Sequence, residues 1–268
     1  MDEKNEQPKI LHPRLSYAII GAAMNVHSEL GPGWDEEIYH KALLHALHAQ
    51  GIKAESKLRG VLENHDLIAD EFELDILVED SIVLELKHIV KPFAPAHYCQ
   101  LINYLKFWGK DLGILINFGL ERLEYKRVPF SPMVGTMTRN ELWNTFSEEN
   151  NKTAKQIYSI LNAVFNDYGL GYSTKTYNGL FITECKFQKT EYDVPSVNLS
   201  YQGSPLGEKI VDAFRINEEA LILISALNDQ SSAIDLARLL SYMKQTKIKA
   251  GILANFGKTT LHIRLLTP

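Results

Sequence analysis

The chain has 268 residues, with 28 Lys and Arg against 33 Asp and Glu, which gives a formal net charge of −5. This length suits two domains of ordinary size, and a hydrophobic content of 45% is typical of soluble globular proteins. No apolar stretch approaches the ~18 residues that span a membrane, and the polar N-terminal segment argues against a secretory signal. The two cysteines form no CxxC pair, which argues against structural zinc and favours a reduced, cytoplasmic protein.

The negative charge is concentrated in one half of the chain. Residues 1–140 carry a net charge of −5, whereas residues 141–268 carry a net charge of 0. A net acidic protein is not an obvious nucleic-acid binder, because phosphate contacts need a basic surface. Carboxylates that hold a metal ion also add to the negative count, so the charge is weak evidence against that class.

The first half reads as an α/β domain with a mixed sheet. The first helix shows helical apolar spacing and stops at Gly31, and the second has Asp35 as a candidate N-cap with Glu36 in its first turn. Strands, a helix and a wholly apolar buried strand follow. The predicted elements are helices at 15–30, 35–49 and 95–108, and strands at 52–57, 58–63, 69–78, 81–88 and 112–117.

The second half repeats the first at a shift of 138 residues. DLGILINFG at 111–119 returns as KAGILANFG at 249–257. Tyr39 falls on Tyr177 at this shift, which favours core packing over catalysis for that tyrosine. The sequence therefore predicts two tandem domains, residues 1–135 and 145–268. In the second we expect helices at 153–168, 174–189 and 231–244, a hairpin of strands 208–216 and 219–226, and a strand at 250–255.

Charged side chains in the first copy suggest a metal site. Glu85 and Lys87 point to the same face of one strand, and Asp75 can lie beside Glu85 across a tight turn. Two adjacent carboxylates repel unless a cation lies between them, and Mg²⁺ binds through one or two carboxylates. Such a metal would polarise a phosphodiester, and Lys87 would stabilise the developing charge. Glu36 could provide another acid, and Gln100 lies on a helix face that could point to the same site.

Each of these signals has a structural alternative. Glu-x-Lys occurs four times in the chain, and a same-face Glu–Lys pair is usually a surface ion pair worth ~0–1 kcal/mol. Here, however, the pair interrupts an apolar strand, where burying charge is costly. Glu36 alone would be a helix-start acid. Asp75 has a near counterpart in Asp212, one residue short of the shift, which hints at a structural contribution. The three histidines of the second helix are expected to be solvated or packing residues: His40, His45 and His48.

The second copy loses most of the polar set. Thr174, Leu223, Ser225 and Arg238 stand at the positions of Glu36, Glu85, Lys87 and Gln100, in that order. Without these groups the second copy cannot readily hold a metal ion. We therefore predict one working site and one inert copy.

The spaced motifs resemble the GxxExxY proteins of the PD-(D/E)XK nuclease superfamily. Gly33-x-x-Glu36-x-x-Tyr39 matches the signature of that family, and the other matching pieces are Asp75, Glu85-Leu86-Lys87, Gln100-x-x-Asn103-Tyr104 and Asn117-Phe118-Gly119. The resemblance covers most of residues 15–128. It implies a restriction-endonuclease-like αβββαβ core and Mg²⁺-dependent cutting of DNA. It also implies Glu36, Asp75 and Glu85 as metal-linked acids, Lys87 as the catalytic lysine and Gln100 as an accessory residue.

The leading hypothesis is a nuclease that uses Mg²⁺, with Mn²⁺ as a substitute, on DNA more readily than on RNA. The fused copies would form a pseudo-dimer with one active site, as a monomer or a homodimer without membrane contact, which favours single-strand cleavage. Two alternatives stay open. One is an inactive nuclease fold that binds nucleic acid or protein, and the other is a hydrolase of a small phosphorylated molecule.

Overall fold

The computed structural model describes residues 10–140, 143, 151–227 and 232–267. Internal contacts divide the chain into two compact units. The first unit holds the residues up to Gly60 together with Glu71–Ser131, and the second holds Val61–Asp70 together with Pro132–Pro268. In the described ranges, no helix combines the length and apolar character needed to cross a membrane.

The first unit opens with two helices that lie against each other, α1 (Pro13–Leu30) and α2 (Glu36–Ala49). Pro13 occupies a first-turn position, where its missing N–H costs nothing, so α1 begins two residues before the predicted start. Gly31 ends α1 with a φ of 68°, a left-handed value that favours glycine. Asp35 is the N-cap of α2 as predicted, although its side chain makes no capping hydrogen bond.

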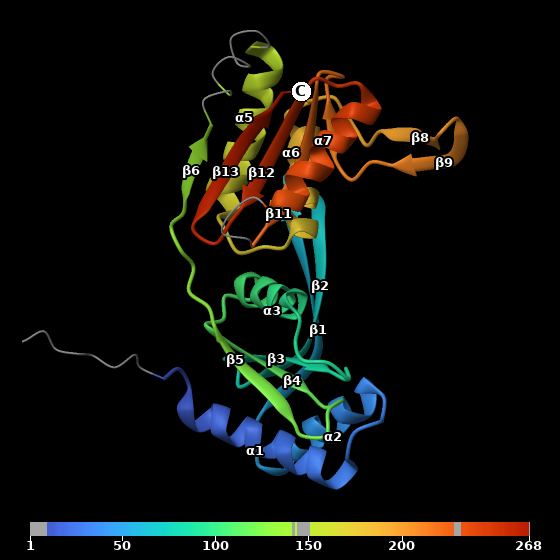
Figure 1. The fold of residues 1–268 in the computed structure, drawn as a ribbon. Coiled ribbons are helices and arrows are strands. Elements are labelled where there is room, and N and C mark those ends of the chain that lie inside the picture. The colour runs from blue at the N-terminus through green and yellow to red at the C-terminus, as the bar shows by residue number, and fades with distance from the viewer. Residues whose placement is uncertain (1–9, 141–142, 144–150, 228–231, 268) are drawn as a thin grey trace, which may run out of the picture. The chain divides into compact units, whose positions relative to one another are not determined.

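A five-stranded sheet completes the first unit, in the order β1-β2-β3-β4-β5 (Figure 1). The β2–β3 and β4–β5 pairs are antiparallel, whereas β3 and β4 are parallel because α3 connects them. The two strands expected at 52–57 and 58–63 form one strand, because Lys57 takes a left-handed φ of 51° without ending the ladder. The elements are β1 (Ala54–Asn64), β2 (Leu67–Val78), β3 (Ile82–Lys87), α3 (Pro95–Phe107), β4 (Leu112–Asn117) and β5 (Glu124–Pro129).

Helices cover both faces of this sheet. Apolar residues of α1 and α2 form one buried cluster with alternate residues of β3, among them Leu84 and Leu86. On the other face α3 approaches closely, because a Cβ on Gly113 would lie 2.6 Å from Cδ1 of Leu101. Side chains of β3 that alternate with Leu84 and Leu86, Glu85 among them, therefore face α3.

The second unit repeats this plan at the 138-residue shift. Helices α5 (Asn151–Tyr168) and α6 (Thr174–Phe187) begin and end 138 residues after α1 and α2. The sheet has the order β6-β13-β12-β11-β10-β7, with β11 and β12 parallel like β3 and β4. Its elements are β6 (Thr136–Arg139), β7 (Tyr192–Asp193), β10 (Phe214–Ile216), β11 (Ala220–Ala226), α7 (Ala233–Thr246), β12 (Ala250–Phe256) and β13 (Thr260–Leu266).

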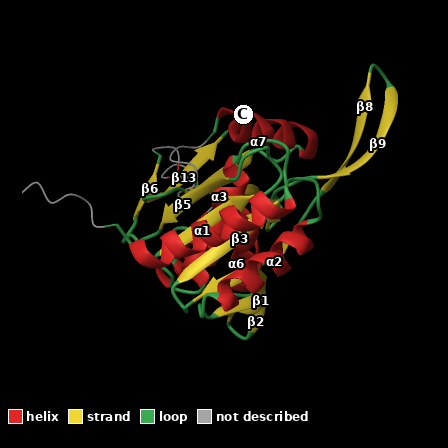
Figure 2. Cartoon of the chain, turned by 90° about the horizontal axis from the view of Figure 1, so that it is seen from below, coloured by secondary structure: helices red, strands yellow, loops and turns green. Residues whose placement is uncertain are grey.

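The strand predicted at 208–216 is wrong, because that segment belongs to two sheets. Its first residues form part of β9 (Ser204–Ile210), which pairs with β8 (Ser196–Tyr201) in a separate two-stranded ribbon. Figure 2 shows the ribbon standing away from the other elements of its unit. Every residue of β9 is exposed, so no packing holds it in the main sheet. Pro195, at the base of the ribbon, cannot donate a ladder hydrogen bond.

The tip of the β1–β2 hairpin is part of the second unit. The buried carboxylate of Asp70 accepts hydrogen bonds from Lys175 Nζ at 2.6 Å and Thr176 Oγ1 at 2.7 Å. Asn64 donates from Nδ2 to Glu184 Oε2 at 3.2 Å. The backbone also approaches α6 closely, since a Cβ on Gly179 would lie 1.8 Å from the Ala69 oxygen. Residues of the first copy thus complete the second unit.

Candidate active site in the first copy

The charged pair of β3 is buried. Glu85 is 1% exposed, and Lys87 Nζ donates a hydrogen bond to its Oε1 at 2.5 Å. The other oxygen, Oε2, is buried and has no hydrogen-bond partner among the described residues. Because a buried carboxylate oxygen without a partner is costly, this atom marks a position where the site is incomplete.

Asp75 lies across the hairpin from Glu85. The β2–β3 register pairs Ile76 with Leu84, so the next position along the antiparallel ladder places Asp75 opposite Glu85. At this position the Leu86 N–H donates to a side chain and not to a backbone oxygen of β2. Its acceptor is Asp75 Oδ2, at 2.7 Å. This hydrogen bond fixes one carboxylate oxygen and orients the other.

Burial and mutual repulsion set the charges of the site. Burial, followed by repulsion from Asp75, raises the pKa of Glu85 to about 8, and Lys87 opposes the shift. Burial also raises the pKa of Asp75, against the Leu86 hydrogen bond and the Lys87 charge. For Lys87, burial lowers the pKa, but the Glu85 charge and hydrogen bond outweigh burial, so its pKa is raised. Glu85 and Asp75 therefore bind a proton more readily than free carboxyls do, whereas Lys87 stays charged.

Glu36 belongs to the edge of the same site. It lies in the first turn of α2 at a position exposed to solvent. Desolvation raises the pKa of its carboxyl, the Lys87 charge lowers it and the Asp75 charge raises it. Glu36 therefore lies close enough to both Lys87 and Asp75 to interact with their charges. No three His, Cys, Asp or Glu side chains of the described ranges are grouped so that they could hold a metal ion.

Helix α3 brings a neutral polar pair to the face on which Glu85 lies. Gln100 Nε2 donates to the Tyr104 hydroxyl at 3.1 Å. Burial raises the pKa of Tyr104 to about 12, and the Glu85 and Asp75 charges contribute to that rise. The structure thus brings Asp75, Glu85, Lys87 and the Gln100–Tyr104 pair into one electrostatic neighbourhood.

Two further residues position the site, although the sequence analysis assigned neither of them a role in it. His40 is buried and donates from Nε2 to the backbone oxygen of Asp75 at 3.1 Å, so of the two expected alternatives it is a packing residue, held by a hydrogen bond. Asn117, fully buried, donates to the Ile89 oxygen at 3.0 Å and accepts the Ile89 N–H at 3.1 Å. It therefore fixes the backbone that follows Lys87. A polar residue at the end of a wholly apolar strand, repeated as Asn255, was the available signal.

The repeated tyrosines are structural in both copies. Tyr39 donates to the Gly31 oxygen at 2.7 Å, and Tyr177 donates to the Gly169 oxygen at 2.6 Å. Tyr39 stacks on Phe118, just after β4, and Tyr177 stacks on Phe256, the last residue of β12, with ring centroids 4.6 Å apart in the first copy and 3.8 Å apart in the second. The repeated tyrosine and the glycine eight residues before it thus maintain the fold in both copies.

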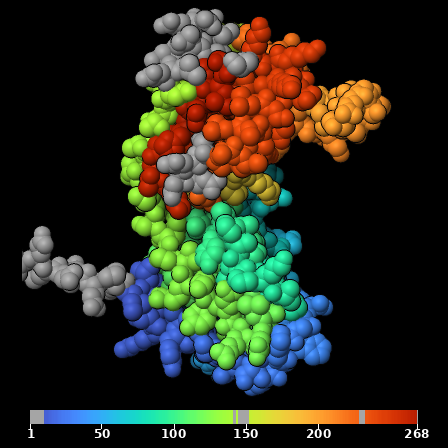
Figure 3. Space-filling view, in the orientation of Figure 1, coloured from blue at the N-terminus to red at the C-terminus, as the bar shows by residue number. Residues whose placement is uncertain are grey.

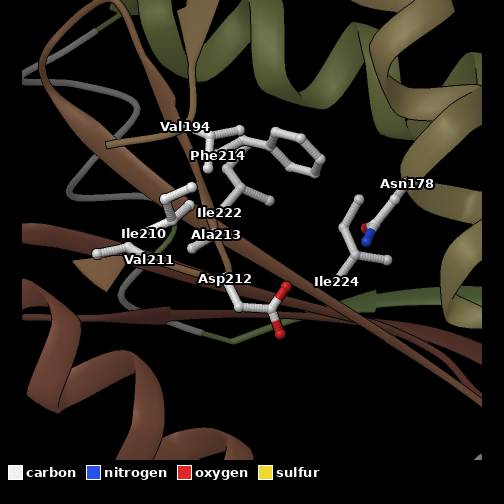
Figure 4. Close-up of a pocket in the computed structure, with 9 residues that line it drawn as sticks. All are labelled: Asn178, Val194, Ile210, Val211, Asp212, Ala213, Phe214, Ile222 and Ile224. Atoms are coloured by element: carbon white, nitrogen blue, oxygen red, sulfur yellow. The ribbon is translucent and has the colours of Figure 1, made fainter. Parts of the chain in front are cut away.

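The second copy has no acids at the corresponding positions. Phe214 pairs with Ile222 as Ile76 pairs with Leu84, so Ala213 takes the place of Asp75. The prediction that Asp212 is the counterpart of Asp75 is therefore wrong. Asp212 lies one residue out of register and forms an ion pair with Arg238. A pocket of about 200 Å³ lies beside Ala213. Most of the side chains that line it are apolar (Figure 4).

Comparisons with known proteins agree with the repeat. The family model of the PD-(D/E)XK nuclease superfamily matches residues 13–128 and again residues 151–265. Among solved structures, the crystal structure of SSO0001 is 21% identical with a TM-score of 0.29, and the match spans 35% of this chain and about half, 48%, of that chain. A search of curated proteins finds no match. Because the family model accounts for most of the chain, the chain belongs to the PD-(D/E)XK nuclease superfamily, with two tandem restriction-endonuclease-like domains.

Proposed function

We propose that the chain is a Mg²⁺-dependent nuclease of the GxxExxY type, with its active site in the first copy. The observation that carries the proposal is the buried Glu85, whose Oε2 has no partner among the described residues while Asp75 lies opposite. A divalent cation coordinates oxygen atoms of one or two carboxylates. It would give Glu85 Oε2 a partner and offset the repulsion between Glu85 and Asp75. Asp75 and Glu85 would hold the ion, with Glu36 as an outer acid.

The side chains of the site have distinct roles in this proposal. A bound Mg²⁺ would supply polarisation of a phosphodiester and a more acidic water. Lys87 stays protonated, because Glu85 outweighs the effect of its burial, so it stabilises developing negative charge instead of acting as a base. The Leu86 N–H orients Asp75, and Gln100 offers a neutral donor on the facing helix.

The second copy supports the fold of the pair without chemistry of its own. Leu223 and Ser225 stand where the first copy has Glu85 and Lys87, and the Ser225 hydroxyl donates to Asn255 Oδ1 at 3.1 Å. We propose DNA as the preferred polymer and single-strand cleavage as the outcome of one active site. A double-strand cut made by a single bound chain would contradict the latter.

A second candidate function is a nuclease fold that binds nucleic acid or protein without cutting. The observation that favours it is the lack, among the described residues, of any three-residue cluster suited to a metal ion. Two carboxylates suffice for Mg²⁺, whose other ligands are waters and substrate, so we place this candidate second.

Cleavage of labelled single- and double-stranded DNA and RNA, with Mg²⁺ or Mn²⁺, tests the proposal. Glu85→Gln and Lys87→Ala should each abolish cleavage. The matched control is Lys126→Ala, which changes another Glu-x-Lys triplet on an exposed strand and should cut like wild type. A wild-type protein that cuts no polymer with either metal, or cleavage that survives Glu85→Gln, would contradict the proposal.

A further inference from the structure

The end of helix α7 carries a group of lysines that the site in the first copy does not use. A groove of about 380 Å³ lies there, in the second unit. Three of its lining residues are lysines and none is acidic, and the full lining is Leu240, Met243, Lys244, Lys247, Ile248 and Lys249. The α7 surface is the orange-red area of the space-filling view in Figure 3.

The three ammonium groups are available to a ligand. All three lysines are exposed, and none forms an ion pair with any residue that the structure describes. By contrast, many cations of the first unit are neutralised by carboxylates, such as Lys57 by Glu37 at 2.7 Å. Unpaired cations around one groove attract a polyanion more than they stabilise the fold.

The helix dipole alone does not explain this group. A lysine in the last turn of a helix, such as Lys244, stabilises the partial negative charge there. Lys247, however, is the C-cap residue in a left-handed conformation, and Lys249 lies beyond the helix. The effect of the dipole falls off within the last turn, so these two gain little from it.

The same corner of the first copy is built differently. At the 138-residue shift Lys247 corresponds to Gly109, and Lys249 corresponds to Asp111, which bonds His12 at 2.9 Å. Lys244 corresponds to Lys106, so the copies differ at two of the three lysine positions, and the half of the chain that lacks the acids is neutral while the other half carries −5. This difference indicates a division of labour between the copies.

The floor of the groove indicates the kind of polyanion. Leu240 is 45% exposed, whereas the other two apolar lining residues, Met243 and Ile248, are buried. An apolar floor with a cationic rim suits a chain of phosphates that carries flat, partly apolar groups, because bases and sugars can cover the floor while phosphates meet the lysines.

We propose that the second copy binds the nucleic-acid backbone through the groove of Lys244, Lys247 and Lys249. This inference rests on the proposed nuclease function and adds a binding role for the copy that cannot cut. It separates chemistry in the first copy from substrate retention in the second.

The test measures binding of labelled duplex and single-stranded DNA to the full chain in EDTA, which prevents cleavage. The variant is the triple change K244E/K247E/K249E. The control is K152E/K155E/K189E, which alters three exposed lysines of the same unit and changes the net charge equally. Thermal melting should show that both variants fold, because all six side chains are exposed.

The groove variant should bind at least about tenfold more weakly, and its log–log salt slope should fall by about 2–3, because each phosphate contact contributes about 0.9 for duplex DNA. The control should retain the wild-type slope. Equal losses in both variants, or none in the groove variant, would overturn the inference. Groove-dependent binding to phosphatidylserine vesicles but not to DNA would also overturn it, in favour of a lipid surface.

The failure of this inference differs from the failure of the proposed function. If the wild type cleaves and the groove variant cleaves with the same KM, the groove does not bind the substrate. The proposed nuclease activity would then still hold. Groove-dependent DNA binding without cleavage in Mg²⁺ or Mn²⁺ would support the groove and overturn the nuclease.

Discussion

Replacing Glu85 with Gln should stabilise the metal-free protein at alkaline pH. The variant keeps the shape of the side chain and removes a buried charge. Burial and Asp75 raise the pKa of Glu85 to about 8 from an ordinary value of 4.5. The folded state therefore keeps the proton that the unfolded chain releases, and the wild type loses stability as the pH rises from 4.5 to about 8.

The size of the effect follows from the shift and from the partner of Glu85. At about 1.4 kcal/mol per pKa unit, ionisation of Glu85 costs at most about 5 kcal/mol. The variant also deprives Lys87 of its counter-charge, although the amide oxygen still accepts a hydrogen bond, so we expect a net gain of about 1–3 kcal/mol above pH 8. The gain should vanish near the ordinary carboxyl pKa.

Urea unfolding in EDTA, from about pH 5 to about pH 9, measures the difference between variant and wild type. Glu73→Gln is the control, because Glu73 lies exposed on β2 in an ion pair with Arg59. Added Mg²⁺ should stabilise the wild type and not the Glu85→Gln variant. A difference in unfolding free energy that does not grow with pH would refute the reasoning that the buried charge limits stability.

Three further predictions concern the second unit. Asp70→Ala should lower the free energy of unfolding by about 2–4 kcal/mol, because it removes the buried acceptor of two hydrogen bonds; a loss below about 0.5 kcal/mol in urea unfolding would contradict this. Gly179→Ala should lower the melting temperature, because its Cβ would meet the Ala69 oxygen, and an unchanged melting temperature would show that the hairpin tip does not pack there. Tyr177→Phe should cost about 1 kcal/mol by calorimetry, while Tyr177→Ala should cost about 3–5 kcal/mol; similar losses for both would rule out ring packing as the main contribution.

The sequence was most predictive where local chemistry decides the structure. The helices of both copies follow from apolar spacing and from stop signals such as Gly31, and their shared shift of 138 residues is confirmed. The tight turn expected between Asp75 and Glu85 forms at Glu79-Asp80, where both residues take left-handed φ values, as tight hairpins require. The Glu85–Lys87 pair on a buried strand is likewise confirmed as a geometric feature, because period-two alternation fixes its face.

Long-range packing limited the rest. The ribbon β8–β9 is hydrogen-bonded like a sheet, but every residue of β9 is exposed, so it has no packing surface in the main sheet. Asp212 fails as a counterpart of Asp75 because a shift of one residue reverses the face of a strand. The contribution of His40 depends on a partner 35 residues away, which no local pattern reveals.

The place of the hairpin tip has a consequence for the growing chain. Asp70 finds its hydrogen-bond partners about a hundred residues later, since it is 105 positions from Lys175 and 106 from Thr176. At a synthesis rate of about 5–20 residues per second, roughly 5–20 s pass between their appearance at the ribosome. During that interval the β1–β2 tip stays in water while the strands behind it are complete. One of the earliest hairpins to be translated is therefore among the last to be buried, and chaperones have time to meet it first.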